Sequence, residues 1–211
     1  MLNNERITDY LKAVESNSPI PGGGSVAALT GAFGVSLALM YQNLSFEKKA
    51  YQRQEDSVKA TFEQAFQEFK TYQSQLLTCA EQDSEAYQLV ITAYQLPKNN
   101  AEEEVTRKQA ISEATIRAIE VPLMTMKVTV ESLKALDKIV GLGNNNAISD
   151  AGVAALLLEA ATKSAYLNIL INCQSLNNER SEKLLSEAKQ YCADAEELKK
   201  KIMAVVDSLI K

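Results

Sequence analysis

The sequence has no histidine among its 211 residues. This absence excludes a serine or cysteine triad built on histidine, zinc bound by imidazole, and an imidazole base that titrates near neutral pH. Acid–base chemistry would therefore use Asp, Glu, Lys, Tyr, Cys or a bound water. Cysteine is also scarce: Cys79, Cys173 and Cys192 lie far apart, without a CxxC pair. We expect free thiols in a reducing cytoplasm and no disulfide framework.

Basic residues are outnumbered, with 22 Lys and Arg against 27 Asp and Glu. The formal net charge is −5 and the isoelectric point is about 5.0. Nucleic acids and anionic membranes favour basic patches, so this balance argues against both as partners. The first residues lack the apolar core of a signal peptide, and we expect a cytoplasmic protein that is not exported.

One long segment carries no charge, between Glu15 and Glu47. It is long enough to span a bilayer, but its glycines, prolines, serines and amides favour a buried helix over a membrane span. The segment predicts a helix over 25–44. Small residues dominate one of its faces, which indicates a central helix that neighbouring helices approach closely. This face consists of Gly24, Ala27, Ala28, Gly31, Val35 and Ala38.

Helical periodicity continues through the rest of the chain. It predicts a short helix near 7–14 and long helices over 51–95, 100–141, 151–176 and 181–210. With no strand alternation, repeat or linker, residues 1–211 are predicted to form one all-α domain, a bundle of long helices. Pro122 predicts a kink in the helix over 100–141. Ser149 is the predicted N-cap of the helix over 151–176. The last helix has a four-three apolar pattern that fits packing against other helices or a second subunit.

Asp83 interrupts an apolar row on the predicted helix over 51–95. The row recurs at alternating steps of four and three residues through Val58, Phe62, Ala65, Phe69, Tyr72, Leu76, Cys79, Asp83, Ala86, Val90 and Ala93. An unpaired buried carboxylate is costly, so such a group is usually paired or functional. Burial would raise its pKa and suit a general acid or base. Alternatively, Asp83 reaches water at the end of the row or pairs with a lysine.

Two polar turns precede predicted helices. The glycine turn, Gly22-Gly23-Gly24-Ser25, would expose helix N-terminal amides that favour an anion or a polar ligand edge. It lacks the lysine of a Walker loop, and a tight turn with close helix packing is the alternative. The second turn, 144–150, could complete a pocket, although capping explains much of its composition.

Polar side chains elsewhere also allow two interpretations. Ser164, Asn168 and Asn172 share one helix face, as a hydrogen-bonded core network or as a pocket wall. Lys98 follows Leu-Pro near a helix junction. It is either a cation for an acidic ligand tail or a solvated surface lysine.

Several of these stretches together resemble a known family. Pro19-Ile-Pro-Gly-Gly-Gly-Ser-Val-Ala-Ala-Leu29 is similar to the opening signature of the cyclodeaminase/cyclohydrolase family. That family includes the cyclodeaminase domain of formiminotransferase-cyclodeaminase and free-standing bacterial methenyltetrahydrofolate cyclohydrolases. Further stretches match in the same order, at 83–87 with 96–98, 121–123, 143–155 and 167–172. The resemblance extends from about residue 5 to 200.

The resemblance implies an all-helical, dimer-forming cytoplasmic enzyme of the free-standing type that acts on one-carbon tetrahydrofolates. The first expected activity is formiminotetrahydrofolate cyclodeaminase, which forms 5,10-methenyltetrahydrofolate and ammonia and belongs to histidine degradation. Methenyltetrahydrofolate cyclohydrolase is an alternative, and a non-catalytic folate-binding protein is a third possibility. No metal and no cofactor beyond the folate substrate are expected.

For this chemistry Asp83 is the first candidate for the acid or base, and Asp150 is the second. The other candidates would bind substrate: Gly22, Gly23, Gly24, Ser25, Asn144 and Asn146 around the folate, with Lys98 on its glutamyl tail. Both reactions pass through a tetrahedral carbon between N5 and N10 and require positioned proton transfers.

Overall fold

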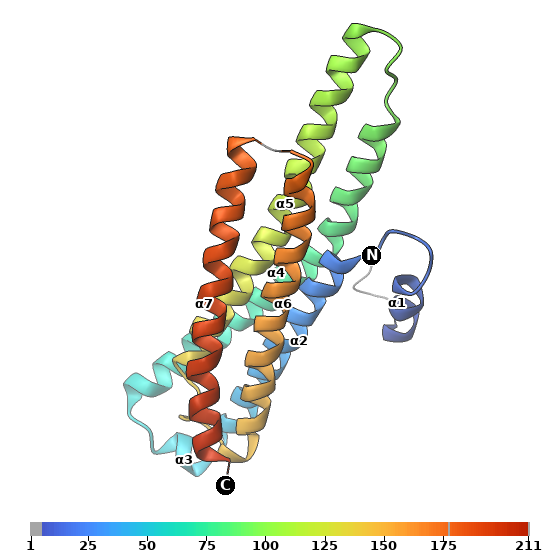
Figure 1. Cartoon of the computed structure of the whole chain (residues 1–211). Helices are drawn as coiled ribbons and strands as arrows, with labels where there is room; N and C mark the ends of the chain where they lie inside the picture. Colours follow the sequence, from blue (N-terminus) through green and yellow to red (C-terminus); the bar gives the residue numbers. More distant parts are fainter. Residues whose placement is uncertain (1–5, 177, 211) are drawn as a thin grey trace.

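The computed structural model describes residues 6–176 and 178–210, and in that part of the chain every regular element is a helix. The elements are α1 (Ile7–Val14), α2 (Gly23–Phe46), α3 (Lys49–Gln52), α4 (Asp56–Gln95), α5 (Ala101–Asp137), the 3-10 helix η2 (Asn145–Ala147), α6 (Ile148–Gln174) and α7 (Glu179–Leu209). The long helices run side by side, α4 and α5 extend as a hairpin beyond the others, and α1 lies off the bundle (Figure 1). The predicted all-α bundle is confirmed.

Helix α2 is central because its buried face is made of small residues. It packs against α6, α4 and α5, and the face predicted from sequence is buried. A Cβ added at Gly31 would lie 2.9 Å from Cγ2 of Thr129 in α5. One added at Gly34 would lie 3.0 Å from Cγ of Leu158 in α6. Larger residues at these positions would separate α2 from its neighbours.

Two predicted boundaries are wrong. The helix expected over 51–95 is broken, with α3 ending at Gln52 and α4 beginning at Asp56. The buried ring of Tyr51 lies between Phe46 and Phe62, with ring centroids 5.4 and 5.1 Å away, so aromatic packing fixes the turn there.

Ser149 is not an N-cap. Helix η2 leads directly into α6, because the side chain of Asn144 accepts the N–H of Asn146 and starts the helical path upstream. The cap predicted before α5 is confirmed: Oδ1 of Asn100 accepts the N–H of Glu103 at 2.9 Å.

Helix α5 continues through Pro122, which has no N–H to donate to the carbonyl of Ala118. Nδ2 of Asn172 in α6 donates to that carbonyl at 3.0 Å and replaces the missing bond. A buried hydrogen bond of 2.8 Å between Thr129 and Thr162 also joins α5 to α6. The kink expected at Pro122 stays a prediction.

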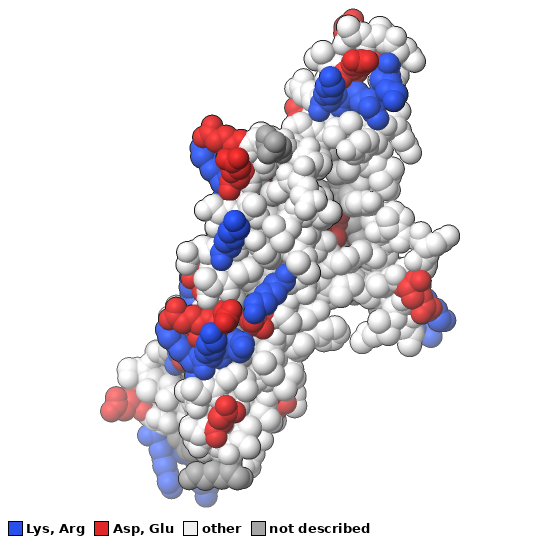
Figure 2. Space-filling view, in the orientation of Figure 1, with Lys and Arg blue, Asp and Glu red and all other residues white. Residues whose placement is uncertain are grey.

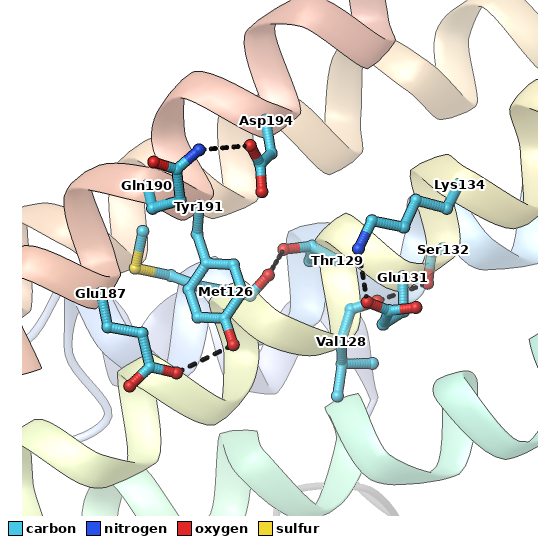
Figure 3. Close-up of polar contacts among 10 residues, drawn as sticks. All are labelled: Met126, Val128, Thr129, Glu131, Ser132, Lys134, Glu187, Gln190, Tyr191 and Asp194. Atoms are coloured by element: carbon cyan, nitrogen blue, oxygen red, sulfur yellow. Dashed lines mark hydrogen bonds and ion pairs between the residues drawn. The ribbon is translucent and has the colours of Figure 1, made fainter.

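Helix α7 packs against α6 and α5, with a polar cluster close by (Figure 3). Its hydrogen bonds connect neighbouring turns of one helix, as in Tyr191–Glu187 at 2.9 Å, Gln190–Asp194 at 2.7 Å and Lys134–Glu131 at 2.8 Å. Burial, followed by the bond to Glu187, raises the pKa of Tyr191 to about 12. The phenol therefore stays protonated at neutral pH, and the hydrogen bonds of this cluster tie successive turns of α5 and of α7 together.

Charged side chains gather on α7, at the tip of the α4–α5 hairpin and on α1, while the surface over α2 and the adjoining flank of α6 is almost free of them (Figure 2). By length and composition, Gly23–Phe46 and Asn145–Gln174 could each cross a membrane. Half of the most apolar window of α2 is buried inside the bundle. Part of its apolar character therefore serves the core of this chain, and the rest faces outward.

Candidate functional site

The N-terminus of α2 lies against Asp83 of α4. The N-cap residue, Gly22, has no side chain to accept the first amides, and the Asp83 carboxylate accepts the N–H of Ser25 instead. A Cβ on Gly24 would lie 2.5 Å from Cγ of Asp83 and 2.7 Å from Oδ2. Glycine at 24 thus makes room for the carboxylate, which caps α2 from another helix.

The surroundings of Asp83 favour its protonated form. Burial raises the pKa of the carboxyl group, and the hydrogen bond from Ser25 N–H opposes this with a smaller effect. Within the described part of the chain, no lysine or arginine forms an ion pair with Asp83. A half-buried carboxylate with a raised pKa is able to accept and return a proton.

Sequence reasoning missed Tyr10. Its hydroxyl donates to Oγ of the fully buried Ser25 at 3.1 Å, and this bond ties α1 to the start of α2. Burial raises the pKa of Tyr10, and the nearby charge of Asp83 acts in the same direction. Helix α1 has no buried residue, so its apolar spacing gave no signal for this contact.

Asn168 of α6 also lies beside the glycine turn. A Cβ on Gly23 would be 3.4 Å from Oδ1 of Asn168, whose Nδ2 donates to the carbonyl of Ser164 at 2.9 Å. The amide therefore borders the first turn of α2, and its role as a pocket wall stays a prediction. Asn172 belongs to a hydrogen-bonded contact within the bundle, through its bond to α5.

The candidates of the second turn lie at the opposite end of α2. Asn144 donates from Nδ2 to the carbonyl of Leu44 at 3.1 Å and from its backbone N–H to Oγ of Ser45 at 2.8 Å. Helix α2 rises about 33 Å between Gly23 and Ser45, at 1.5 Å per residue. A single chain therefore does not bring Asn144, Asn146 and Asp150 near Asp83.

Lys98 is also remote from Asp83. It is exposed in the connection between α4 and α5, and α4 alone rises about 18 Å from Asp83 to its last residue. A cleft of about 350 Å³ opens between α4, α5 and α7. Its lining includes Gln82, Arg117 and Lys127, and neither Asp83 nor the glycine turn takes part in it.

The fold and the site define a class: an all-helical protein in which a half-buried carboxylate meets the N-terminal amides of a central, glycine-rich helix. Residues 6–191 match the family model described as formiminotransferase-cyclodeaminase. The chain belongs to this family.

Relatives in the family are enzymes. The chain is 36% identical over 211 residues to a methenyltetrahydrofolate cyclohydrolase from Methylorubrum extorquens AM1, covering all of both chains. It is 32% identical over 192 residues to the formimidoyltransferase-cyclodeaminase of Mus musculus, covering 87% of this chain and 35% of the mouse protein. A crystal structure of formiminotetrahydrofolate cyclodeaminase from Thermotoga maritima superimposes with a TM-score of 0.86 and 25% identity, covering both chains fully. This chain is an enzyme of the same family.

Proposed function

We propose that this protein acts on one-carbon tetrahydrofolates, with Asp83 as proton acceptor and donor, and that its activity is methenyltetrahydrofolate cyclohydrolase. The observation that carries the proposal is Asp83 itself: half-buried, with a raised pKa, and set against the exposed start of α2. The choice of hydrolysis is supported by the 36% identity to a cyclohydrolase over its full length. This choice puts the cyclohydrolase before the cyclodeaminase, whereas the sequence resemblance led us to expect the cyclodeaminase first.

The substrate carbon lies between N5 and N10 and carries a delocalised positive charge, which the Asp83 carboxylate would attract. The Asp83 carboxylate takes a proton from a water molecule while the oxygen of that water bonds to the substrate carbon. The product of this step is a neutral tetrahedral carbinolamine. The bond from this carbon to N5 then breaks, and Asp83 returns its proton to N5. The hydroxyl loses its proton to solvent, leaving the 10-formyl product.

Substrate positioning falls to the groups around Asp83. The amides at Gly22, Gly23 and Gly24 would orient the pterin ring, while the buried hydroxyl of Ser25 would act behind them by holding Tyr10 beside the site. Glycine also lets a flat ring approach the backbone closely.

Cyclodeamination of 5-formiminotetrahydrofolate is the second candidate. The match to the Thermotoga maritima cyclodeaminase over both full chains favours it. Here N10 attacks the formimino carbon, and the protonated carboxyl of Asp83 supplies the proton that departs with ammonia. This activity would place the protein in histidine degradation.

The near-ultraviolet absorbance of methenyltetrahydrofolate separates the candidates. With purified protein, a fall faster than the spontaneous rate would establish the cyclohydrolase. A rise from 5-formiminotetrahydrofolate with release of ammonia would establish the cyclodeaminase. Asp83→Asn should reduce either rate by about 10² to 10⁴-fold, while Glu85→Gln, an exposed carboxylate on the same helix, should not. Folate binding without either change would indicate a non-catalytic folate-binding protein and refute the proposal.

The location, the subunit number and the need for a cofactor are further parts of the proposal. We propose a cytoplasmic enzyme that works as a homodimer and needs no metal and no cofactor beyond its folate substrate. The three unpaired cysteines support a reducing compartment such as the cytoplasm. Proton transfer by a carboxylate suffices for either reaction, which supports the absence of a cofactor.

A further inference from the structure

Tyr10 reaches the candidate site from a helix that adds nothing to the buried core. Helix α1 lies off the bundle and has no buried residue (Figure 1). Ile7 and Leu11 on its apolar side are exposed, whereas Tyr10 is half-buried and its hydroxyl donates to Oγ of Ser25 at 3.1 Å. Core packing therefore does not account for this contact, and its position at the first turn of α2 indicates a role in the site.

Ser25 connects Tyr10 to Asp83. The Asp83 carboxylate accepts the backbone N–H of Ser25, and the Ser25 side chain accepts a hydrogen bond from the hydroxyl of Tyr10. Two oxygen groups from different helices, α1 and α4, are thus each one hydrogen bond away from the same residue. Electrostatics agrees with this proximity: burial raises the pKa of Tyr10, and the charge of Asp83 acts in the same direction.

The Tyr10 hydroxyl has capacity for a further partner. A tyrosine hydroxyl donates one hydrogen bond and also accepts through its lone pairs. Its proton is directed at Ser25, and among the described residues no group donates to its oxygen. With a raised pKa the phenol stays protonated at neutral pH, so it does not compete with Asp83 as a base. Its oxygen can therefore accept a hydrogen bond from a small donor that enters the site.

We propose that Tyr10 is a positioning residue for the water that attacks the substrate. This inference rests on the proposed function. The water donates one hydrogen to a free lone pair of the Asp83 carboxylate and the other to the oxygen of Tyr10. With both of its O–H bonds fixed, a lone pair of the water faces the substrate carbon, which reduces the entropy cost of the attack.

Tyr10 undergoes no net chemistry in this arrangement. The water oxygen bonds to the substrate carbon, and its first proton goes to Asp83. Its second hydrogen stays on that oxygen as the hydroxyl of the carbinolamine. The Tyr10 hydroxyl keeps its own proton throughout and remains bonded to Ser25. Tyr10 therefore affects the rate through the water and is neither the acid nor the base.

This role separates the two folate reactions. Hydrolysis needs a water molecule as its nucleophile, and that water has to be held in place. In cyclodeamination the nucleophile is N10 of the substrate itself, so no water is positioned. Tyr10 should therefore contribute to hydrolysis alone, and its presence favours the cyclohydrolase activity.

Replacing Tyr10 by phenylalanine removes the hydroxyl and keeps the ring. In the methenyltetrahydrofolate absorbance assay, kcat of Tyr10→Phe should fall about 10- to 100-fold. KM should stay within about two-fold of the wild type, because the folate loses no contact of its own. The matched control is Tyr94→Phe, at an exposed tyrosine about 16 Å further along α4 from Asp83, and it should keep the wild-type kcat. An unchanged kcat in Tyr10→Phe, or a rise in KM alone, would overturn the proposal.

Ser25→Ala tests whether Tyr10 and Ser25 act together. Alanine keeps the backbone N–H that Asp83 accepts and removes the Oγ that directs the Tyr10 hydroxyl. Its kcat should fall for the same reason, and Tyr10→Phe/Ser25→Ala should lose no more than the larger of the two single losses. Losses that multiply in the double variant would show that the two groups act independently, and the arrangement would be wrong.

Asn168 provides the competing acceptor, because its Oδ1 also lies near the glycine turn. Asn168→Ala should leave kcat for hydrolysis within about two-fold of the wild type if Tyr10 holds the water. If Asn168→Ala shows the large loss in kcat and Tyr10→Phe does not, the water is held by Asn168 and the assignment to Tyr10 fails.

The failure of this inference differs from the failure of the proposed function. If the wild type hydrolyses methenyltetrahydrofolate and Tyr10→Phe does so at the same rate, the proposed function stands and the role of Tyr10 is wrong. If the wild type turns over neither folate, the proposed function fails and this inference fails with it. Where cyclodeamination is measurable, Tyr10→Phe should retain its rate, and a loss equal to that in hydrolysis would refute the positioning of water.

Discussion

Gly24→Ala places a methyl group against the candidate catalytic carboxylate. The new Cβ would lie 2.5 Å from Cγ of Asp83, with both oxygens also inside contact distance, so the carboxylate has to move. At Gly23 the same substitution meets only the Asn168 amide, at 3.4 Å, which is an ordinary contact. Gly23→Ala is therefore the matched control, one residue away on the same helix.

The two substitutions should differ in the sign of their effect on stability. Replacing glycine by alanine in a helix gains up to about 1 kcal/mol. Overpacking at 24 costs about 1–3 kcal/mol, which leaves a net loss of up to about 2 kcal/mol. Gly23→Ala should keep its gain, so the variants should differ by about 1–3 kcal/mol in free energy of unfolding. Displacing the carboxylate should also slow turnover of Gly24→Ala by at least about 10²-fold.

Urea unfolding and the methenyltetrahydrofolate absorbance assay together test this reasoning. Gly24→Ala/Asp83→Ala provides a further control, because removing the carboxylate leaves room for the methyl group. Its stability should recover relative to Gly24→Ala, while activity stays low. If Gly24→Ala unfolds at the wild-type urea concentration and keeps wild-type turnover, Asp83 does not pack against α2 as described.

Two further predictions concern a pH dependence and a hydrogen bond. Burial raises the pKa of Asp83 in the folded state above its value in the unfolded state, which is about 3.9. The protonated carboxyl group therefore contributes its full stabilisation below the unfolded pKa. That stabilisation is lost as the pH rises through the folded pKa. The melting temperature of Asp83→Asn relative to wild type should therefore rise between pH 4 and pH 8; a difference independent of pH would contradict this. Asn172→Ala should cost about 1–3 kcal/mol, because it leaves the Ala118 carbonyl unpaired. In a Pro122→Ala background, the N–H of Ala at position 122 can donate to the Ala118 carbonyl. Denaturant unfolding should therefore show that Asn172→Ala costs less stability in this background than in the wild type. Equal costs in the two backgrounds would show that Asn172 does not replace the bond that Pro122 lacks.

The long helices were predictable because their apolar spacing persists over many turns, and Asp83 stood out as a break in that spacing. The contact of Tyr10 with Ser25 could not be predicted from the sequence, because it depends on how α1 folds back onto α2. Local aromatic packing at Tyr51 and the cap formed by Asn144 likewise overrode the boundaries that periodicity suggested.

The separation of the candidate residues between the two ends of α2 shows a different limit. The resemblance grouped the glycine turn and segment 144–150 as parts of one site, but it contained no information on the distance between them within one chain. The distance follows from the anchoring of Asn144 at Leu44 and Ser45, which only the tertiary structure reveals. The spacing of residues along a sequence predicts which residues share a helix face, but it does not predict which other segment packs against that face.

The distribution of residue size around α2 shows what its charge-free segment does within the bundle. Glycine and alanine face the chain's own core, while Phe33 and Met40 face outward. The small residues let α4, α5 and α6 approach α2 closely, since a Cβ at Gly31 or Gly34 would lie within 3.0 Å of a neighbouring side chain. The absence of charge along this segment is thus explained by close packing, and the same close approach at Gly24 places the Asp83 carboxylate against the first amides of α2.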